Sequence, residues 1–302
     1  MTNLTIWRAA ILLLTLLYCG SAIAKPLVIG YIAEDPSGEI RRLQPVVDYL
    51  ARHLKEFGIS KGEVMVIRSI HEMADLFKKN KVDLYMDSPF PSLAVSRLSG
   101  SKILLRRWRA GVAEYHSVIF AREDSKITSG EQLKGKLMGF EEPYSTSGYF
   151  LPKAHLLSLR FKLSPYKWGA ISSKADEIGY VFTHEDENTM EQVLRRKVAA
   201  GAMDNINFER RARKQRDRLN ILYRTVRVPR QLVSFRKDLD EKMTNKIREL
   251  LIDMEHSIEG AEILKKFSRT ARFDDIPGGA EKALAPASNL LKYVDAELVS
   301  EK

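Results

Sequence analysis

The sequence has few of the residues and segments that mark several common protein classes. It contains one cysteine, Cys19, in 302 residues, which excludes a disulfide scaffold and a metal or redox centre built on cysteine. No apolar run of 18 or more residues occurs beyond the N-terminus, so a polytopic membrane protein is excluded as well. Hydrophobic residues still make up 44% of the chain, enough for the packed core of one large or two ordinary domains.

The first 24 residues have the pattern of a secretory signal peptide. Arg8 precedes the apolar residues 9–18, and an Ala-Ile-Ala sequence ends at Ala24. A cationic start, an apolar segment too short to span a bilayer and small residues at its end predict cleavage after Ala24 and export to the periplasm. A lipoprotein anchor at Cys19 is the alternative, but it needs a small residue where Tyr18 stands.

Strands and helices alternate in the first part of the mature chain. The predicted order is strand 27–32, helix 40–54, strand 63–67, helix 69–80 and strand 82–86. This alternation indicates a doubly wound α/β domain, whose ligands gather at the carboxyl ends of the strands. The loop after Tyr31 and residues 87–92, where Pro89 and Pro91 predict a loop, are therefore the first candidates for a binding site.

A second α/β unit follows the first. Its predicted elements are strand 136–140, helix 148–159, a long polar stretch to about Asn188, helix 190–198 and strand 199–204. Similar apolar strands at residues 115–122 and 227–238 flank it, which indicates that the chain leaves the first lobe and later returns. We predict two lobes joined by two crossing strands, with a cleft that closes by a hinge. The predicted boundaries are lobe 1 at 25–118, lobe 2 at 119–228, and a return to lobe 1 with C-terminal helices at 229–302.

The segment 141–152 carries the most informative pattern in the chain. It joins a predicted strand to a predicted helix and contains Ser145, Thr146 and Ser147. The first N–H groups of a helix have no intrahelical partner, and with the helix dipole and nearby hydroxyls they suit a tetrahedral oxyanion. The alternative is that Ser145 or Ser147 is an ordinary N-cap, and the pattern alone favours neither interpretation.

Four segments together carry a family resemblance. They are Gly30-Tyr31, the strand at 82–84 with Ser88-Pro89, Tyr115-His116-Ser117, and Ser145-Thr146-Ser147-Gly148-Tyr149 with Leu151-Pro152. This set resembles the phosphate/phosphite/phosphonate-binding family of ABC-transporter substrate-binding proteins, from about Leu27 to Met254. The resemblance implies a type II periplasmic-binding-protein fold, a cleft between two lobes and a ligand with a phosphoryl-type head group.

The resemblance also implies which residues bind the ligand. In that family the Ser-Thr-Ser string and the amide at the helix start hold the oxygens of the anion. The first-strand loop and the aromatic and hydroxyl residues before the first crossover face the ligand too. By match, with His116 as a lesser candidate, the expected ligand-binding set is Tyr31, Ser88, Tyr115, His116, Ser117, Tyr144, Ser145, Thr146, Ser147 and Asp204.

The chemistry of the ligand is less closely specified than the presence of an anion site. Asp204 would accept a hydrogen bond from a ligand that still carries a donor, and capping the next helix is an equal alternative. Ser88-Pro89-Phe90 stands where the family commonly has Gly-Pro followed closely by tyrosine, and Glu141-Glu142 add negative charge. These departures leave a general oxyanion site and do not single out phosphonate.

The remaining signals indicate structural roles. The six histidines are scattered without an H-x-x-x-H pair, and no G-x-S-x-G sequence occurs, which speaks against a metal site and a hydrolase elbow. Two basic runs, at 106–109 and 210–218, are interpreted as solvated helix faces and not as nucleic-acid contacts. Their positive potential, within a formal net charge of +10, would also draw anions toward the cleft.

The leading hypothesis is a non-catalytic periplasmic binding protein, without a cofactor or metal. It would capture a small oxyanion such as phosphate, phosphite or a phosphonate and deliver it to an ABC permease. A sensory module for a membrane receptor or kinase is the first alternative. A phosphoesterase is the second, and it lacks a visible metal set or activated nucleophile.

Overall fold

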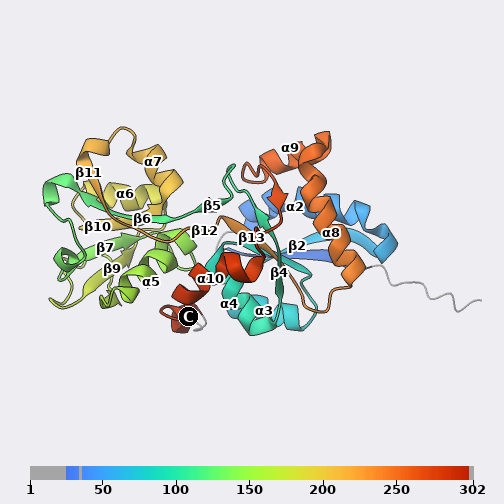
Figure 1. Ribbon diagram of the computed structural model, residues 1–302, viewed down its shortest axis with the longest axis horizontal. Coiled ribbons are helices and arrows are strands. Elements are labelled where there is room, and N and C mark those ends of the chain that lie inside the picture. Colours follow the sequence, from blue (N-terminus) through green and yellow to red (C-terminus); the bar gives the residue numbers. More distant parts are fainter. Residues whose placement is uncertain (1–24, 34–35, 299–302) are drawn as a thin grey trace, which may run out of the picture.

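The computed structural model describes residues 25–33 and 36–298, so the predicted signal peptide, with Cys19 and the cleavage site, lies outside the described residues. The described chain forms two α/β lobes that lie side by side (Figure 1). Across the described residues, every helix is too short or too polar to span a bilayer.

The first lobe is built on a six-stranded mixed sheet in the order β14-β4-β13-β3-β1-β2. Its strands are β1 (Lys25–Ile32), β2 (Ile59–Ile67), β3 (Leu84–Asp87), β4 (Lys102–Arg107), β13 (Gln231–Phe235) and β14 (Phe273–Asp274). Its helices are α2 (Pro36–His53), α3 (Ile70–Lys78), α4 (Pro89–Ser99), α8 (Glu241–Asp253) and α9 (Ile258–Lys266). The alternation predicted for residues 27–86 is confirmed, with β1 parallel to both β2 and β3.

The second lobe has a six-stranded sheet of its own, in the order β11-β6-β10-β7-β9-β8. Its strands are β6 (Ser117–Arg122), β7 (Leu137–Phe140), β8 (Leu163–Pro165), β9 (Ile178–Phe182), β10 (Ala200–Asp204) and β11 (Leu219–Arg224). Its helices are the π-helical turn η4 (Thr146–Phe150), α5 (Leu151–Ser158), α6 (Asp186–Leu194) and α7 (Asn205–Ala212). The short 3-10 turns of the two lobes together are η1 (Lys55–Phe57), η2 (Glu123–Ser125), η3 (Glu131–Leu133), η5 (Arg216–Arg218) and η6 (Met254–His256).

Two short strands connect the lobes. β5 (Glu114–Tyr115) pairs antiparallel with β12 (Val228–Pro229), so the chain crosses twice at one place. The C-terminal helices are α10 (Ala280–Leu291) and α11 (Asp295–Leu298). α10 packs against α4 of the first lobe, α5 of the second and β12 between them (Figure 1). The segment after Pro277 thus contacts both lobes.

Apolar helix faces cover both sides of each sheet. On one side of the first sheet, α2 and α8 bury residues such as Leu43 and Ile247 against Leu27 and Leu84. On the other side, α3 and α4 share one continuous core with α5 and α10 that runs into the second lobe. α6 and α7 cover the remaining face of the second sheet. Burial of these faces provides the main driving force for folding.

Some predicted boundaries are wrong, each for a local reason. Pro89 and Pro91 do not form a loop, because α4 begins at Pro89, where proline's missing N–H is one that the first turn leaves unpaired anyway. The helix predicted at 190–198 begins at Asp186 and ends at Leu194. The polar stretch before it contains β8 and β9, whose short apolar sequence offered little periodicity to recognise.

The basic run at 106–109 is not a solvated helix face. Arg106 and Arg107 lie at the end of β4 and are 6% and 1% exposed. Arg106 forms ion pairs with Asp274 at 2.7 Å and Glu114 at 3.2 Å. Hydrogen bonds satisfy the guanidinium of Arg107, from its nitrogens to Thr270 Oγ1, Gln231 Oε1 and Phe267 O. The local sequence therefore suggests exposed charges, whereas contacts with distant residues allow these two arginines to be buried.

Candidate ligand-binding site

In each lobe, polar residues lie at the ends of neighbouring strands. In the second sheet, Asp204 at the end of β10 pairs with Ser117 at the start of β6. β7 runs parallel to β10, so Glu141, the residue after β7, lies at the same edge. In the first sheet, β13 aligns Leu232 with Asp87 at the end of β3. Asp87 and Asp204 thus end their strands, and Glu141 directly follows its strand.

Ser145 caps the helix that follows β7. Its Oγ accepts a hydrogen bond from the Gly148 N–H at 2.9 Å and donates one to Glu141 Oε2 at 2.6 Å. A Cβ at Gly148 would collide with Glu141 and the Ser145 hydroxyl, so this tight turn requires glycine. The amides of Thr146 and Ser147 begin η4 and have no acceptor within the helix. The capping interpretation fits the Ser145 side chain, whereas the two following amides keep the capacity to bind an anion.

Thr146 links the two lobes directly. Its hydroxyl accepts a hydrogen bond from the Phe90 N–H at 3.1 Å and donates one to Ser88 Oγ at 2.9 Å. Ser88 in turn donates to Asp87 Oδ1 at 3.0 Å. The rings of Phe90 and Phe150 stack beside this contact with a centroid distance of 6.1 Å. The helix start of the second lobe therefore lies against the β3–α4 junction of the first.

Ser147 joins the same helix start to the connecting strands. Its side chain hydrogen-bonds the hydroxyl of Tyr115, and its carbonyl accepts from Ser117 Oγ at 2.7 Å. Burial raises the pKa of Tyr115 to about 12, so the phenol keeps its proton and can donate to a ligand oxygen. Ser117 is fully buried, and its hydroxyl supports the loop from behind.

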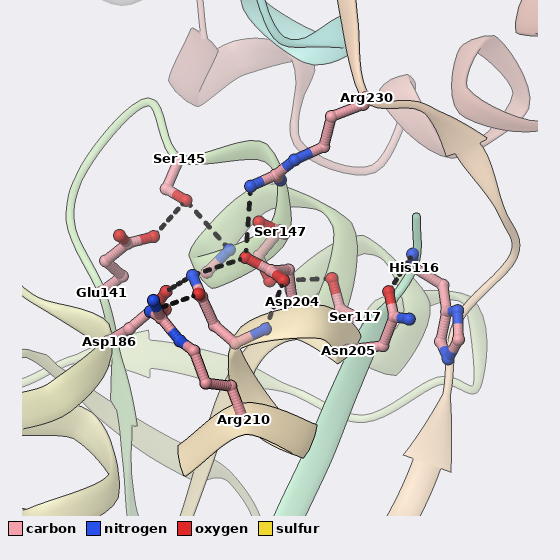
Figure 2. Close-up of polar contacts among 12 residues, drawn as sticks. His116, Ser117, Glu141, Ser145, Ser147, Asp186, Asp204, Asn205, Arg210 and Arg230 are labelled. Atoms are coloured by element: carbon pink, nitrogen blue, oxygen red, sulfur yellow. Dashed lines mark hydrogen bonds and ion pairs between the residues drawn. The ribbon is translucent and has the colours of Figure 1, made fainter. Parts of the chain in front are cut away.

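Three carboxyl groups lie on the second-lobe wall of this region (Figure 2). Asp204 Oδ1 caps α7 through the Asn207 N–H at 2.8 Å, and the Asn207 side-chain amide donates to Asp204 at 2.9 Å and to Asp186 at 2.5 Å. Burial raises the pKa of Glu141 to about 7, and burial together with the Glu141 charge raises the pKa of Asp186 to about 7. Near neutral pH these two carboxyls hold protons part of the time, which reduces repulsion of an anion.

Guanidinium groups lie on the opposite side. Arg230, just after β12, contacts Asp204 Oδ2 at 3.4 Å, and its guanidinium lies 4.2 Å from the centre of the Tyr115 ring. Arg107 and Arg109, at and beyond the end of β4, add two further positive charges near the end of β1. Burial and the charges of Arg109 and Arg230 lower the pKa of Arg107. Arg109 and Arg230 therefore each act on the charge of Arg107.

The other expected residues lie in different surroundings. Tyr31, at the end of β1, faces Asp87 and Arg109 on the first-lobe wall, and burial raises its pKa to about 12. His116 donates its backbone N–H to Asn205, and its imidazole points away from Ser147 and Arg230 (Figure 2). Tyr144 has a left-handed backbone with φ 71° and packs at the edge of the core.

Of the expected set, the structure brings together Ser88, Tyr115, Ser117, Thr146, Ser147 and Asp204, with Ser145 turned to Glu141. Sequence reasoning missed Asp186, Arg109 and Arg230. Arg230 follows the second crossing strand and Arg109 ends a basic run, so both had a positional signal. Asp186 had none, because only the fold of α6 brings it to Asp204.

A family model described as "ABC transporter, phosphonate, periplasmic substrate-binding protein" matches residues 29–276. Among solved structures, XAC2383 from Xanthomonas citri bound to ATP is 25% identical and superposes with a TM-score of 0.81, covering 89% of this chain and 98% of that one. PhnD1 from Prochlorococcus marinus in complex with methylphosphonate is 17% identical, with a TM-score of 0.64 and coverages of 90% and 99%.

A binding-protein component of an ABC phosphonate transporter, PA3383 from Pseudomonas aeruginosa, is 19% identical, with a TM-score of 0.57 and coverages of 91% and 96%. At these identities, PhnD1 and PA3383 indicate a common fold. The two-lobed architecture with a two-strand hinge, predicted from the sequence, is confirmed.

Proposed function

The chain belongs to the phosphonate family of ABC-transporter periplasmic substrate-binding proteins, and from this we propose that its cleft captures a small phosphoryl-type oxyanion, which is passed to an ABC permease. Its fold is the type II periplasmic-binding-protein fold. One observation carries the proposed site: the amides of Thr146 and Ser147, which have no acceptor among the described residues, begin a helix where both lobes and the hinge meet. Helix N-termini favour anions because of their free N–H groups and positive dipole end.

We propose separate roles for the groups around the head group. The amides of Thr146 and Ser147 and the Tyr115 hydroxyl would donate to the phosphoryl oxygens. Thr146 and Ser88 would hold the lobes together over the bound ligand, since their hydroxyls are engaged with each other. Ser145 and Ser117 would position the loop through their bonds to Glu141 and the Ser147 carbonyl. Tyr144 remains a proposed ligand-binding residue, and His116 remains a lesser candidate.

The carboxyl groups narrow the class of ligand. Asp204 and its two neighbours would repel a fully ionised head group and favour one that still carries a proton or another donor. A monoprotonated phosphonate, phosphite or phosphate meets this condition near neutral pH. Because XAC2383 is described as bound to ATP, a nucleoside triphosphate also belongs among the compounds to test.

A thermal-shift screen of the purified protein tests this proposal. The panel is phosphate, phosphite, methylphosphonate, ATP, sulfate and two organic acids. A ligand that binds only the folded state raises the melting temperature. At a ligand concentration one hundred times the dissociation constant, the free energy of unfolding rises by about 2.7 kcal/mol. We expect at least one phosphoryl compound to do so and sulfate to have less effect. Absence of any shift with every phosphoryl compound would contradict the proposal.

The partner and the absence of catalysis also belong to this proposal. A permease is the partner that the family implies, and co-purification with a permease, as opposed to a membrane receptor or kinase, would separate the two assignments.

Within the described residues, no three histidine, cysteine, aspartate or glutamate side chains are grouped to hold a metal. We propose binding without covalent chemistry, and turnover of a generic phosphoester would contradict it. Cleavage after Ala24 remains a prediction.

A further inference from the structure

Arg109 is a charged residue near the proposed site. The roles proposed above for binding a phosphoryl head group do not include it. β13 aligns Gln231 with Arg107 and Leu232 with Asp87, so the ends of β4 and β3 meet at one sheet edge. Arg109 lies two residues beyond the end of β4. Its backbone is held there by an N–H bond to Arg107 O at 3.1 Å and a β-bridge to Val112. The topology therefore places the backbone of Arg109 on the first-lobe side of the proposed site.

The arginines near the cleft differ in their partners. Arg106 pairs with Asp274, Arg107 donates to three acceptors, and Arg230 contacts Asp204. Arg109 is partly buried, and within the described residues its guanidinium makes no hydrogen bond or ion pair. The N–H groups of this guanidinium therefore keep the capacity to form charge-assisted hydrogen bonds to an external anion.

The groups around Arg109 favour its positive charge: burial lowers its pKa, but electrostatic interactions with Tyr31, Glu39, Tyr115 and Asp87 outweigh burial and raise it. Tyr31 and Tyr115 face it as neutral phenols, since burial raises the pKa of each to about 12. Asp87 is engaged by Ser88 and by the Tyr85 hydroxyl at 2.7 Å, and burial raises its pKa. Glu39, the remaining acidic neighbour, forms its ion pair with Arg42. With Arg107 close by, the wall keeps an excess of positive charge.

Tyr115 places this charge within reach of the proposed head-group site. Its side chain hydrogen-bonds Ser147 at the helix start, and the charge of Arg109 acts on its hydroxyl. A small molecule held by the amides of Thr146 and Ser147 would therefore extend past Tyr115 toward Arg109. The bidentate fork of arginine matches a carboxylate or a phosphoryl group.

We propose that Arg109 binds a second anionic group of the ligand, a carboxylate or a further phosphoryl group, on the wall opposite the Ser145–Ser147 helix start. This inference rests on the proposed function and specifies its substrate class: a phosphoryl compound with two separated anionic ends. The carboxyls of the second lobe oppose the head group, and Arg109 supplies attraction at the other end of the molecule.

Titration calorimetry with matched phosphonates tests this inference. The ligands are methylphosphonate, which has one anionic end, and phosphonoacetate and 3-phosphonopropionate, which have two. The proteins are the wild type, Arg109→Gln, and Arg195→Gln as a control that removes one exposed positive charge just after the C-terminal end of α6 in the second lobe. Melting temperatures of the free proteins verify that each variant is folded.

We expect the wild type to bind the better of the two-ended ligands about tenfold or more tightly than methylphosphonate, as a charge-assisted hydrogen bond of about 1.5 to 3 kcal/mol implies. Arg109→Gln should lose this preference while its affinity for methylphosphonate stays within about twofold of wild type, a change under 0.5 kcal/mol. Arg195→Gln should keep the preference.

Two results would overturn the inference and leave the proposed function intact. One is wild-type binding of methylphosphonate with no gain from either carboxylate. The other is an Arg109→Gln variant that retains the preference or weakens all three ligands equally. If no phosphonate, phosphate or phosphite binds the wild type, the proposed function itself fails, and the inference fails with it.

Discussion

The two sides of the proposed ligand-binding site differ in their charged groups. On the second lobe, a helix start with free amides lies beside Glu141, Asp186 and Asp204. On the opposite side, the ends of β4 and β12 present Arg109 and Arg230. Under the proposed function, this contrast means that oriented amides and hydroxyls, and not net charge, hold the head group, while the guanidinium groups supply the attraction.

The largest expected effect comes from breaking the ion pair between Arg230 and Asp204. Arg230→Met leaves the Asp204 carboxylate, 4% exposed, without its cation, and we expect the free energy of unfolding to fall by about 3 kcal/mol. Urea unfolding measures this loss. A double variant with Asp204→Asn should recover most of it. The neighbouring control Arg227→Met, at a largely exposed side chain, should change stability by less than about 0.5 kcal/mol, and an equal loss in both single variants would contradict the argument.

A smaller effect is expected at the point where the lobes touch. Thr146→Val removes the acceptor of the Phe90 N–H and the donor to Ser88 while keeping the side-chain shape. The free energy of methylphosphonate binding, measured by calorimetry, should become less favourable by about 1 to 3 kcal/mol. Closure of the lobes would then bury the Phe90 N–H without an acceptor. Thr146→Ser keeps the hydroxyl and should bind nearly as wild type. Unchanged affinity in the valine variant would remove Thr146 from the closing contact.

The smallest expected effect is the pH dependence of the acidic wall. The folded-state pKa of Glu141 and Asp186 is raised to about 7, above unfolded values near 4.5 and 3.8, so the folded state holds their protons more tightly. The stability that these protons provide is therefore complete below about pH 4 and lost as pH rises through 7. The charged groups that act on the pair are Glu142, Glu185, Asp204 and Arg211.

Urea unfolding at pH 5.5 and pH 8 would measure this effect. The wild type should lose about 1 to 2 kcal/mol more than the Glu141→Gln/Asp186→Asn variant between the two values, since one pKa unit corresponds to about 1.4 kcal/mol. Methylphosphonate affinity of the wild type should also weaken at the higher pH. Parallel losses of stability in both proteins would show that these carboxyls do not titrate in this range.

The sequence predicted the elements whose signals are local. Periodic apolar spacing indicated the helix that buries Leu43, and β-branched runs indicated β1 and β7. The hydroxyl string before Gly148 indicated an anion site at a strand-to-helix junction. β4 was missed because the local sequence around Arg106 and Arg107 suggests exposed charges. Their partners, Asp274 and Gln231, lie more than a hundred residues away in the chain.

What the sequence determined by itself was the alternation of strands and helices, the two crossings between lobes and one helix start rich in hydroxyls, because each depends on neighbours in the chain. Only the tertiary structure decided which charges face that helix start. Asp186, Asp204 and Arg230 meet through strand order and through the crossing at β12. The pKa of a carboxyl depends on burial and on nearby charge, and both arise only when distant segments pack together.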